Sequence, residues 1–90
     1  MSETDFLENC HRYRKQGYTF LGLHSRPDLV VYLFQGDGQI FELEQPIEDG
    51  AVVSITQVFP LADFAERQMY RDSKIKAIGN INLVPRGNLK

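Results

Sequence analysis

The chain has 90 residues and a formal net charge of −2, which suits one small domain and excludes a second. Its hydrophobic fraction of 42% is too high for a disordered chain. One cysteine, Cys10, excludes an internal disulfide, and the sequence has neither a secretory signal nor an apolar run long enough to span a bilayer. We therefore expect a cytoplasmic protein whose association with a membrane, if any, is peripheral and made through partner proteins.

Charge is segregated along the chain. Residues 27–66 contain eight acids and no Lys or Arg: Asp28, Asp37, Glu42, Glu44, Glu48, Asp49, Asp63 and Glu66. The following stretch is basic, with Arg67, Arg71, Lys74, Lys76, Arg86 and Lys90 against Asp72 alone. This asymmetry can steer docking onto a charged partner, although ordinary solvated faces explain it about as well. The acidic balance disfavours nucleic-acid binding.

A helix is predicted at the N-terminus. The stretch Ser2-Glu3-Thr4-Asp5 has the form of a capping box, and Phe6, Cys10 and Tyr13 follow at helical spacing. Gly17 is expected to end this helix as its C-cap.

Strands are predicted over residues 18–24, 29–34 and 39–44, because these runs are rich in aromatic and aliphatic residues and lie between turn signals. Asp37-Gly38 is expected to form a two-residue hairpin loop, which would pair Phe34 with Phe41 and Tyr32 with Leu43. A β-branched run over residues 51–56 is expected to add another strand through Val53 and Ile55.

A second amphipathic helix is predicted after Phe59-Pro60, because Leu61, Phe64, Ala65 and Met69 recur at three- and four-residue intervals. The predicted fold class is therefore α+β, with an N-terminal helix, a mainly antiparallel sheet of about four strands and a second helix packed on one face. The single domain is expected to cover residues 2–80, with a C-terminal tail at 81–90.

Side chains that could carry chemistry are sparse. Cys10 lies on the apolar stripe of its predicted helix, and adjacent helical residues point about 100° apart, so it does not pair readily with His11. One cysteine and two histidines, His11 and His24, give no spacing typical of a metal site. Glu42 and Glu44 fit a solvated strand edge better than an acid and base pair. We predict no catalytic residue, no metal and no cofactor.

The most specific pattern in the sequence is the strand-to-helix segment over residues 54–72, SITQVFPLADFAERQMYRD. It resembles the signature of the family of the 30 kDa subunit of respiratory complex I, in which a Ser-Val-Thr strand and an aromatic-Pro pair lead into a helix reading Glu-Arg-Glu-x-Tyr-Asp. Gln68 stands where the family has its second Glu, and Arg71 where it has Asp. The family's downstream Arg-Arg stretch is missing, so the chain resembles a short, divergent member such as the equivalent subunit of Ech-type energy-converting membrane-bound nickel-iron hydrogenases.

The resemblance implies a cofactor-free scaffold that packs against a hydrogenase-like large subunit and an iron-sulfur small subunit on the inner face of the membrane. Electron transfer would belong to those partners. The expected partner-binding residues are Glu66, Arg67, Tyr70, Arg71, Lys74 and Lys76. A subunit of this kind can self-associate when isolated. Two other readings stay open: a stand-alone protein-binding module of the same fold, and a small enzyme that uses Cys10 or the histidines.

Overall fold

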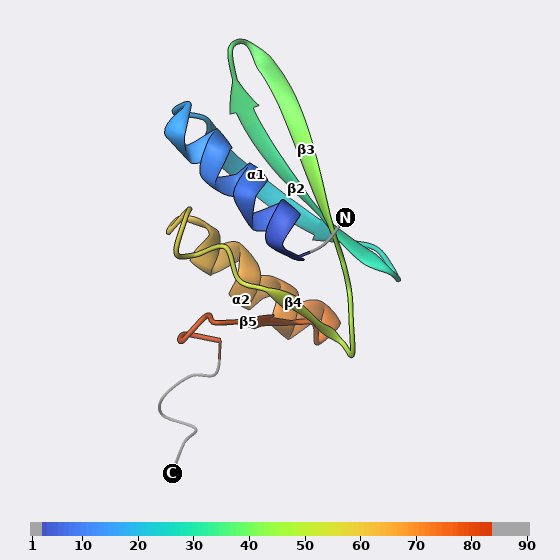
Figure 1. Ribbon diagram of the computed structural model, residues 1–90. Coiled ribbons are helices and arrows are strands. Elements are labelled where there is room, and N and C mark those ends of the chain that lie inside the picture. Colours follow the sequence, from blue (N-terminus) through green and yellow to red (C-terminus); the bar gives the residue numbers. More distant parts are fainter. Residues whose placement is uncertain (1–2, 84–90) are drawn as a thin grey trace.

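The computed structural model describes residues 3–83, and it confirms the predicted α+β class. Ser2 of the predicted capping box and residues 84–90 of the predicted tail lie outside the described residues. In chain order the elements are α1 (Glu3–Lys15), β1 (Thr19–Ser25), β2 (Leu29–Gly36), β3 (Gln39–Pro46), β4 (Ala51–Val53), α2 (Ala62–Ser73) and β5 (Lys76–Ile78) (Figure 1). No helix among these residues has the length and apolar content needed to cross a bilayer.

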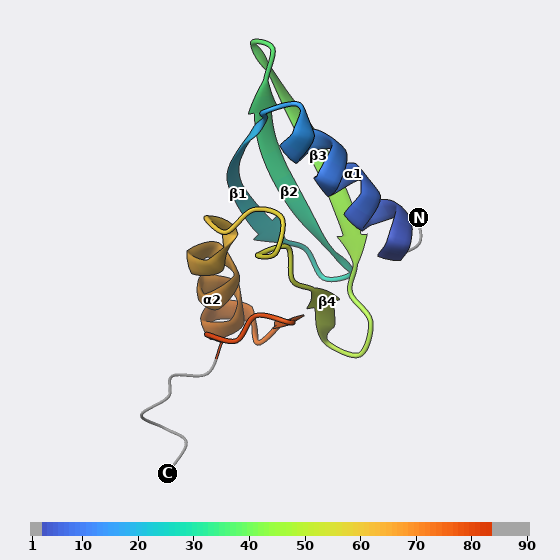
Figure 2. The same ribbon diagram turned by 60° about the vertical axis from the view of Figure 1, so that its left-hand side comes forward.

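The main sheet is antiparallel, with strands in the order β1-β2-β3. The predicted register is confirmed, since Phe34 pairs with Phe41 and Tyr32 with Leu43. Asp37 and Gly38 both have positive φ, at 52° and 73°, as a two-residue turn between right-twisted strands requires. The turn projects beyond both helices (Figure 1, Figure 2).

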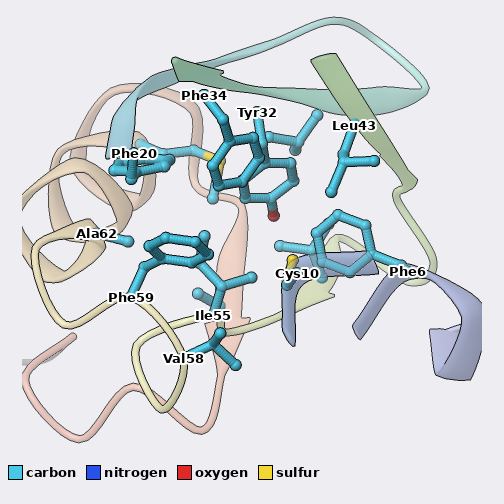
Figure 3. Close-up of a cluster of buried hydrophobic side chains, with 14 of the residues drawn as sticks. Phe6, Cys10, Phe20, Tyr32, Phe34, Leu43, Ile55, Val58, Phe59 and Ala62 are labelled. Carbon is cyan, nitrogen blue, oxygen red and sulfur yellow. The ribbon is translucent and has the colours of Figure 1, made fainter. Parts of the chain in front are cut away.

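Both helical segments cover the same face of this sheet. Phe6 of α1 lies 5.0 Å from Tyr32 between ring centroids, and Phe59, just before α2, lies 5.1 Å from Phe34. Tyr32 and Phe34 alternate with Leu33 along β2, so they point to one face, and Figure 3 shows Cys10 in the same cluster. The aromatic side chains of this face form the core of the domain.

The predicted strand over residues 51–56 is shorter than expected. It ends at Val53 and pairs in parallel with β5, instead of extending the antiparallel sheet. The side chain of Gln45 occupies the backbone groups of Val53, accepting from its N–H at 2.7 Å and donating to its carbonyl at 3.2 Å. The same amide donates to the hydroxyl of Tyr32 at 3.0 Å. One side chain therefore joins β4 to β3 where a strand ladder was expected.

The face of α2 that meets the core also differs from the prediction. Met69 is buried as expected, but Leu61 is 79% exposed and Phe64 is 61% exposed. The buried positions of the helix are Ala62, Glu66 and Met69, which have the same three- and four-residue spacing as the predicted stripe. The buried Glu66 therefore takes a core position that a stripe of apolar residues does not mark.

Candidate functional site on the second helix

Cations gather at the C-terminal end of α2 and continue into β5. Arg71, Lys74 and Lys76 are exposed, and none of them forms a salt bridge with another residue of the described range 3–83. Lys74 ends the helix in the left-handed conformation, with φ 61°, and its backbone N–H donates to the carbonyl of Tyr70 at 2.9 Å. Its ammonium lies 6.0 Å from the ring centroid of Tyr70, which is half-buried. Four of the six expected partner-binding residues therefore lie between the last turn of α2 and the start of β5.

Arg67 lies on the same helix but is engaged within it. Its Nε donates to Asp63 Oδ2 at 3.0 Å, one turn earlier, and its guanidinium carbon lies 5.7 Å from the ring centroid of Phe64. The side chain of Arg67 is 40% exposed, so both contacts contribute little to the free energy of folding, but they restrict where its guanidinium lies. Asp63 is thus the ion-pair partner of Arg67 within α2.

Glu66 does not belong to this surface, and its assignment as a partner-binding residue is wrong because its side chain is fully buried. Its Oε1 accepts hydrogen bonds from the hydroxyl of Ser54 at 2.7 Å and from the amide of Asn80 at 2.9 Å. Its Oε2 accepts from the backbone N–H of Ile55 at 2.8 Å. We call these four residues the Glu66 clamp. The clamp joins α2 to the segment after β4 and to the turn after β5.

The electrostatics of the clamp follow from its burial. Burial raises the pKa of the Glu66 carboxyl, and the nearby charge of Asp63 raises it further. The three hydrogen bonds from Ile55, Ser54 and Asn80 oppose this rise because they favour the ionised form. All three donors point at the carboxylate, so the group is a structural acceptor within the domain.

Ser54 is not arranged as a nucleophile. Its hydroxyl donates to Glu66, and its oxygen accepts from the backbone N–H of Thr56 at 3.1 Å and lies 2.8 Å from the hydroxyl of Thr56. A nucleophilic serine needs a lone pair directed at substrate and a base to take its proton in an accessible site. Here the side chain is buried and its oxygen is saturated with local contacts.

Sequence reasoning missed the apolar part of the surface. Leu61 lies just before α2 and Phe64 lies in its first turn. Ile81, which is 78% exposed, follows β5. The side chain of Asn82 donates to Asp63 at 3.3 Å, which brings this turn beside the start of α2. The sequence did contain a signal for this exposure. Val58 and Phe59 are apolar and lie just before the helix, so they can fill the core without Leu61 and Phe64. The outer surface of α2 is therefore apolar at its start and basic at its end.

A shallow groove of about 300 Å³ borders this surface between α2 and β1. Leu23, Phe64, Ala65 and Met69 make its wall mainly apolar, and Asp72 lies among its polar lining residues. Its shape suits the side chain of a docking protein better than a reaction that needs converging polar groups.

The thiol of Cys10 and the two histidines were the other groups expected to carry any chemistry. Cys10 is buried, and its burial raises the pKa of the thiol to about 12. A thiol in this environment is a poor nucleophile because its thiolate is scarce at neutral pH. Within residues 3–83, no group of three or more His, Cys, Asp or Glu side chains is placed to hold a metal ion.

Comparison with family models, with curated proteins and with solved structures gives no match for this chain.

Proposed function

We propose that this chain is a cofactor-free structural subunit of an energy-converting hydrogenase or of a complex I-like NADH:quinone oxidoreductase. Its role is to dock on the hydrogenase-like large subunit and the iron-sulfur small subunit, at the inner face of the membrane. The proposal comes from the resemblance of residues 54–72 to the signature of the complex I family described above.

The observation that carries the proposal is that the signature has a physical role in this fold. Three of the residues that match it, Ser54, Thr56 and Glu66, are hydrogen-bonded to one another, directly or through Ser54. They hold α2 against the end of β4, and so they set the direction in which the outer surface of the helix faces. In this proposal the signature residues position the outer surface of α2 for docking, and none of them has to act in catalysis.

The composition of the surface supports docking on protein. Large exposed apolar side chains at Leu61 and Phe64 can supply a desolvated centre, and Arg71 and Lys74 can supply a polar rim. Cations at the rim mainly raise the association rate and select acidic partners. In this proposal the groove between α2 and β1 receives a side chain of the partner.

Capture from the native host tests the proposal. A tagged chain should retain a large subunit of the nickel-iron hydrogenase or quinone-reductase type together with an iron-sulfur subunit, identified by mass spectrometry. The variant Phe64→Asp should weaken capture by roughly 30-fold if the side chain is an interface hot spot. Arg71→Glu should slow association and make it less dependent on salt.

Matched controls separate the surface from general effects. Leu21→Asp places the same acid at another exposed apolar position, and Arg14→Glu reverses an exposed cation on α1. Both should leave capture unchanged. Retention of neither redox subunit by the wild-type chain would refute the proposal, and reproducible capture of a partner outside any redox complex would favour the stand-alone binding module.

A further inference from the structure

The outer edge of β3 is a regular strand edge without a neighbouring strand among residues 3–83. In the β2–β3 hairpin, Gly36 pairs with Gln39 next to the two-residue turn, and the ladder runs without a break to Pro46. Residues of β3 that bond to β2 alternate with residues whose backbone N–H and C=O point outward. The outward residues are Ile40, Glu42 and Glu44, and all three are exposed. Within residues 3–83 no strand pairs with this edge.

The other edge of the sheet is less regular, although each edge strand has a helix beside it, α1 beside β3 and α2 beside β1. The register of β1 shifts between Phe20 and Gly22, which leaves Leu21 as a bulge. A bulge twists a strand edge and interrupts regular pairing. The hydroxyl of Ser25 also lies 3.2 Å from that of Ser73, at the end of α2, so the helix runs beside β1. The edge of β3 is therefore the one suited to accept another strand.

Charge specifies what kind of strand fits. Glu42 and Glu44 are two residues apart, so their side chains share the sheet face opposite the helices, and neither forms a salt bridge with another described residue. Immediately before Glu42 in the strand, Phe41 points to the helix side and is half-buried against Tyr13, with 5.8 Å between ring centroids. An added strand would meet carboxylates on one face and aromatic surface on the other.

We propose that an extended segment of another polypeptide, with basic and apolar residues in alternation, adds to β3 as a fourth strand. Its backbone would bond to Ile40, Glu42 and Glu44, its basic side chains would face the two carboxylates, and its apolar side chains would pack beside Phe41. A second copy of this chain does not fit, because antiparallel pairing of two β3 edges brings the same carboxylates together. This edge is separate from the surface of α2, so the inference does not depend on the proposed function.

Titration with a synthetic peptide of alternating valine and lysine, followed by NMR, tests the inference. The backbone amides of Ile40, Glu42 and Glu44 should shift and become protected from hydrogen exchange, because they gain hydrogen bonds. Two further peptides are N-methylated, one at its valines and the other at its lysines. Only one of these two sets of N–H groups faces β3 in the bound strand, so one of the two peptides should lose binding. A valine and glutamate peptide should bind more weakly.

Protein variants then isolate the charge. The double variant Glu42→Gln, Glu44→Gln should weaken binding of the valine and lysine peptide by roughly 2- to 30-fold, since each exposed ion pair contributes little to the binding free energy. Glu48→Gln with Asp49→Asn removes the same charge from the exposed loop after β3 and should have no such effect. Glu42→Lys with Glu44→Lys should reverse the preference between the two peptides.

Several results would overturn the inference. These are binding that tolerates both N-methylated peptides, amide shifts centred on α2, no shifts at millimolar peptide, or concentration-dependent shifts of β3 without peptide, which would identify a second copy as the occupant.

Discussion

Removal of the Glu66 carboxylate should destabilise the domain strongly. In Glu66→Ala, the N–H of Ile55 and the amide of Asn80 lose a buried acceptor, and Ser54 keeps only its contacts with Thr56. Each orphaned buried donor costs about 1–3 kcal/mol, so we expect a loss of about 3–5 kcal/mol in the free energy of unfolding. Domains of this size have about 5–15 kcal/mol in total, so the variant should be close to unfolded at the low end.

Glu66→Gln separates the hydrogen bonds from the charge. The Gln carbonyl oxygen can still accept from Ser54 and Asn80, but its amide meets the N–H of Ile55 donor to donor. It also removes a charge whose burial is unfavourable, and this cost of burial is what raises the pKa of the Glu66 carboxyl. We expect Glu66→Gln to cost less than half as much as Glu66→Ala at neutral pH.

The sign of the pH dependence follows from the raised pKa. The folded state holds the Glu66 proton more tightly than the unfolded state, whose pKa is near the ordinary value of 4.5. The stabilisation from the bound proton is therefore complete below 4.5 and decreases as the pH rises through the folded pKa. Compared with Glu66→Gln, the wild-type chain should lose stability as the pH rises from 4.5 towards neutrality.

Urea unfolding followed by far-ultraviolet circular dichroism measures these differences, since the chain has no tryptophan to report by fluorescence. Glu42→Gln, at an exposed glutamate, is the matched control and should change stability by less than about 0.5 kcal/mol. The reasoning fails if Glu66→Ala is as stable as this control, or if Glu66→Gln keeps the wild-type pH dependence.

Three smaller predictions concern the sheet and core. Gly38→Ala should cost about 1 kcal/mol in urea unfolding, because its φ of 73° disfavours a side chain, and an unchanged midpoint would contradict the turn. Tyr32→Phe should cost about 1 kcal/mol, because the hydroxyl accepts from Gln45, and a neutral result would mean that Gln45 finds another acceptor. Cys10 should resist a thiol reagent at neutral pH until urea unfolds the chain, given its pKa of about 12; fast labelling of the folded chain would show that it is accessible.

Local signals were sufficient for the hairpin. Asp37-Gly38 between alternating apolar residues specifies both the turn and the register, so the pairing of Phe34 with Phe41 could be predicted from neighbours in sequence. The helices were predictable for the same reason, since the 3.6-residue period and Gly17 mark them locally.

The candidate site was harder to predict because it depends on contacts between distant segments. Glu66 is buried only because Ser54, Ile55 and Asn80 converge on it from two other segments. Without those donors a glutamate on a helix is best placed in solvent, and the prediction put it there. Phe64 was then assigned to the core by its period, although it lies outside. Because Glu66 was placed in solvent, the predicted core face of α2 differs from the observed one.

Photo-crosslinking from position 64 in the native host tests most directly whether the outer surface of α2 docks on a redox complex. With a photoreactive residue replacing Phe64, we predict a covalent adduct with the large subunit or the iron-sulfur subunit, and none from a reactive residue at Arg14. Adducts from both positions in equal yield, or only adducts between copies of this chain, would contradict the proposed role.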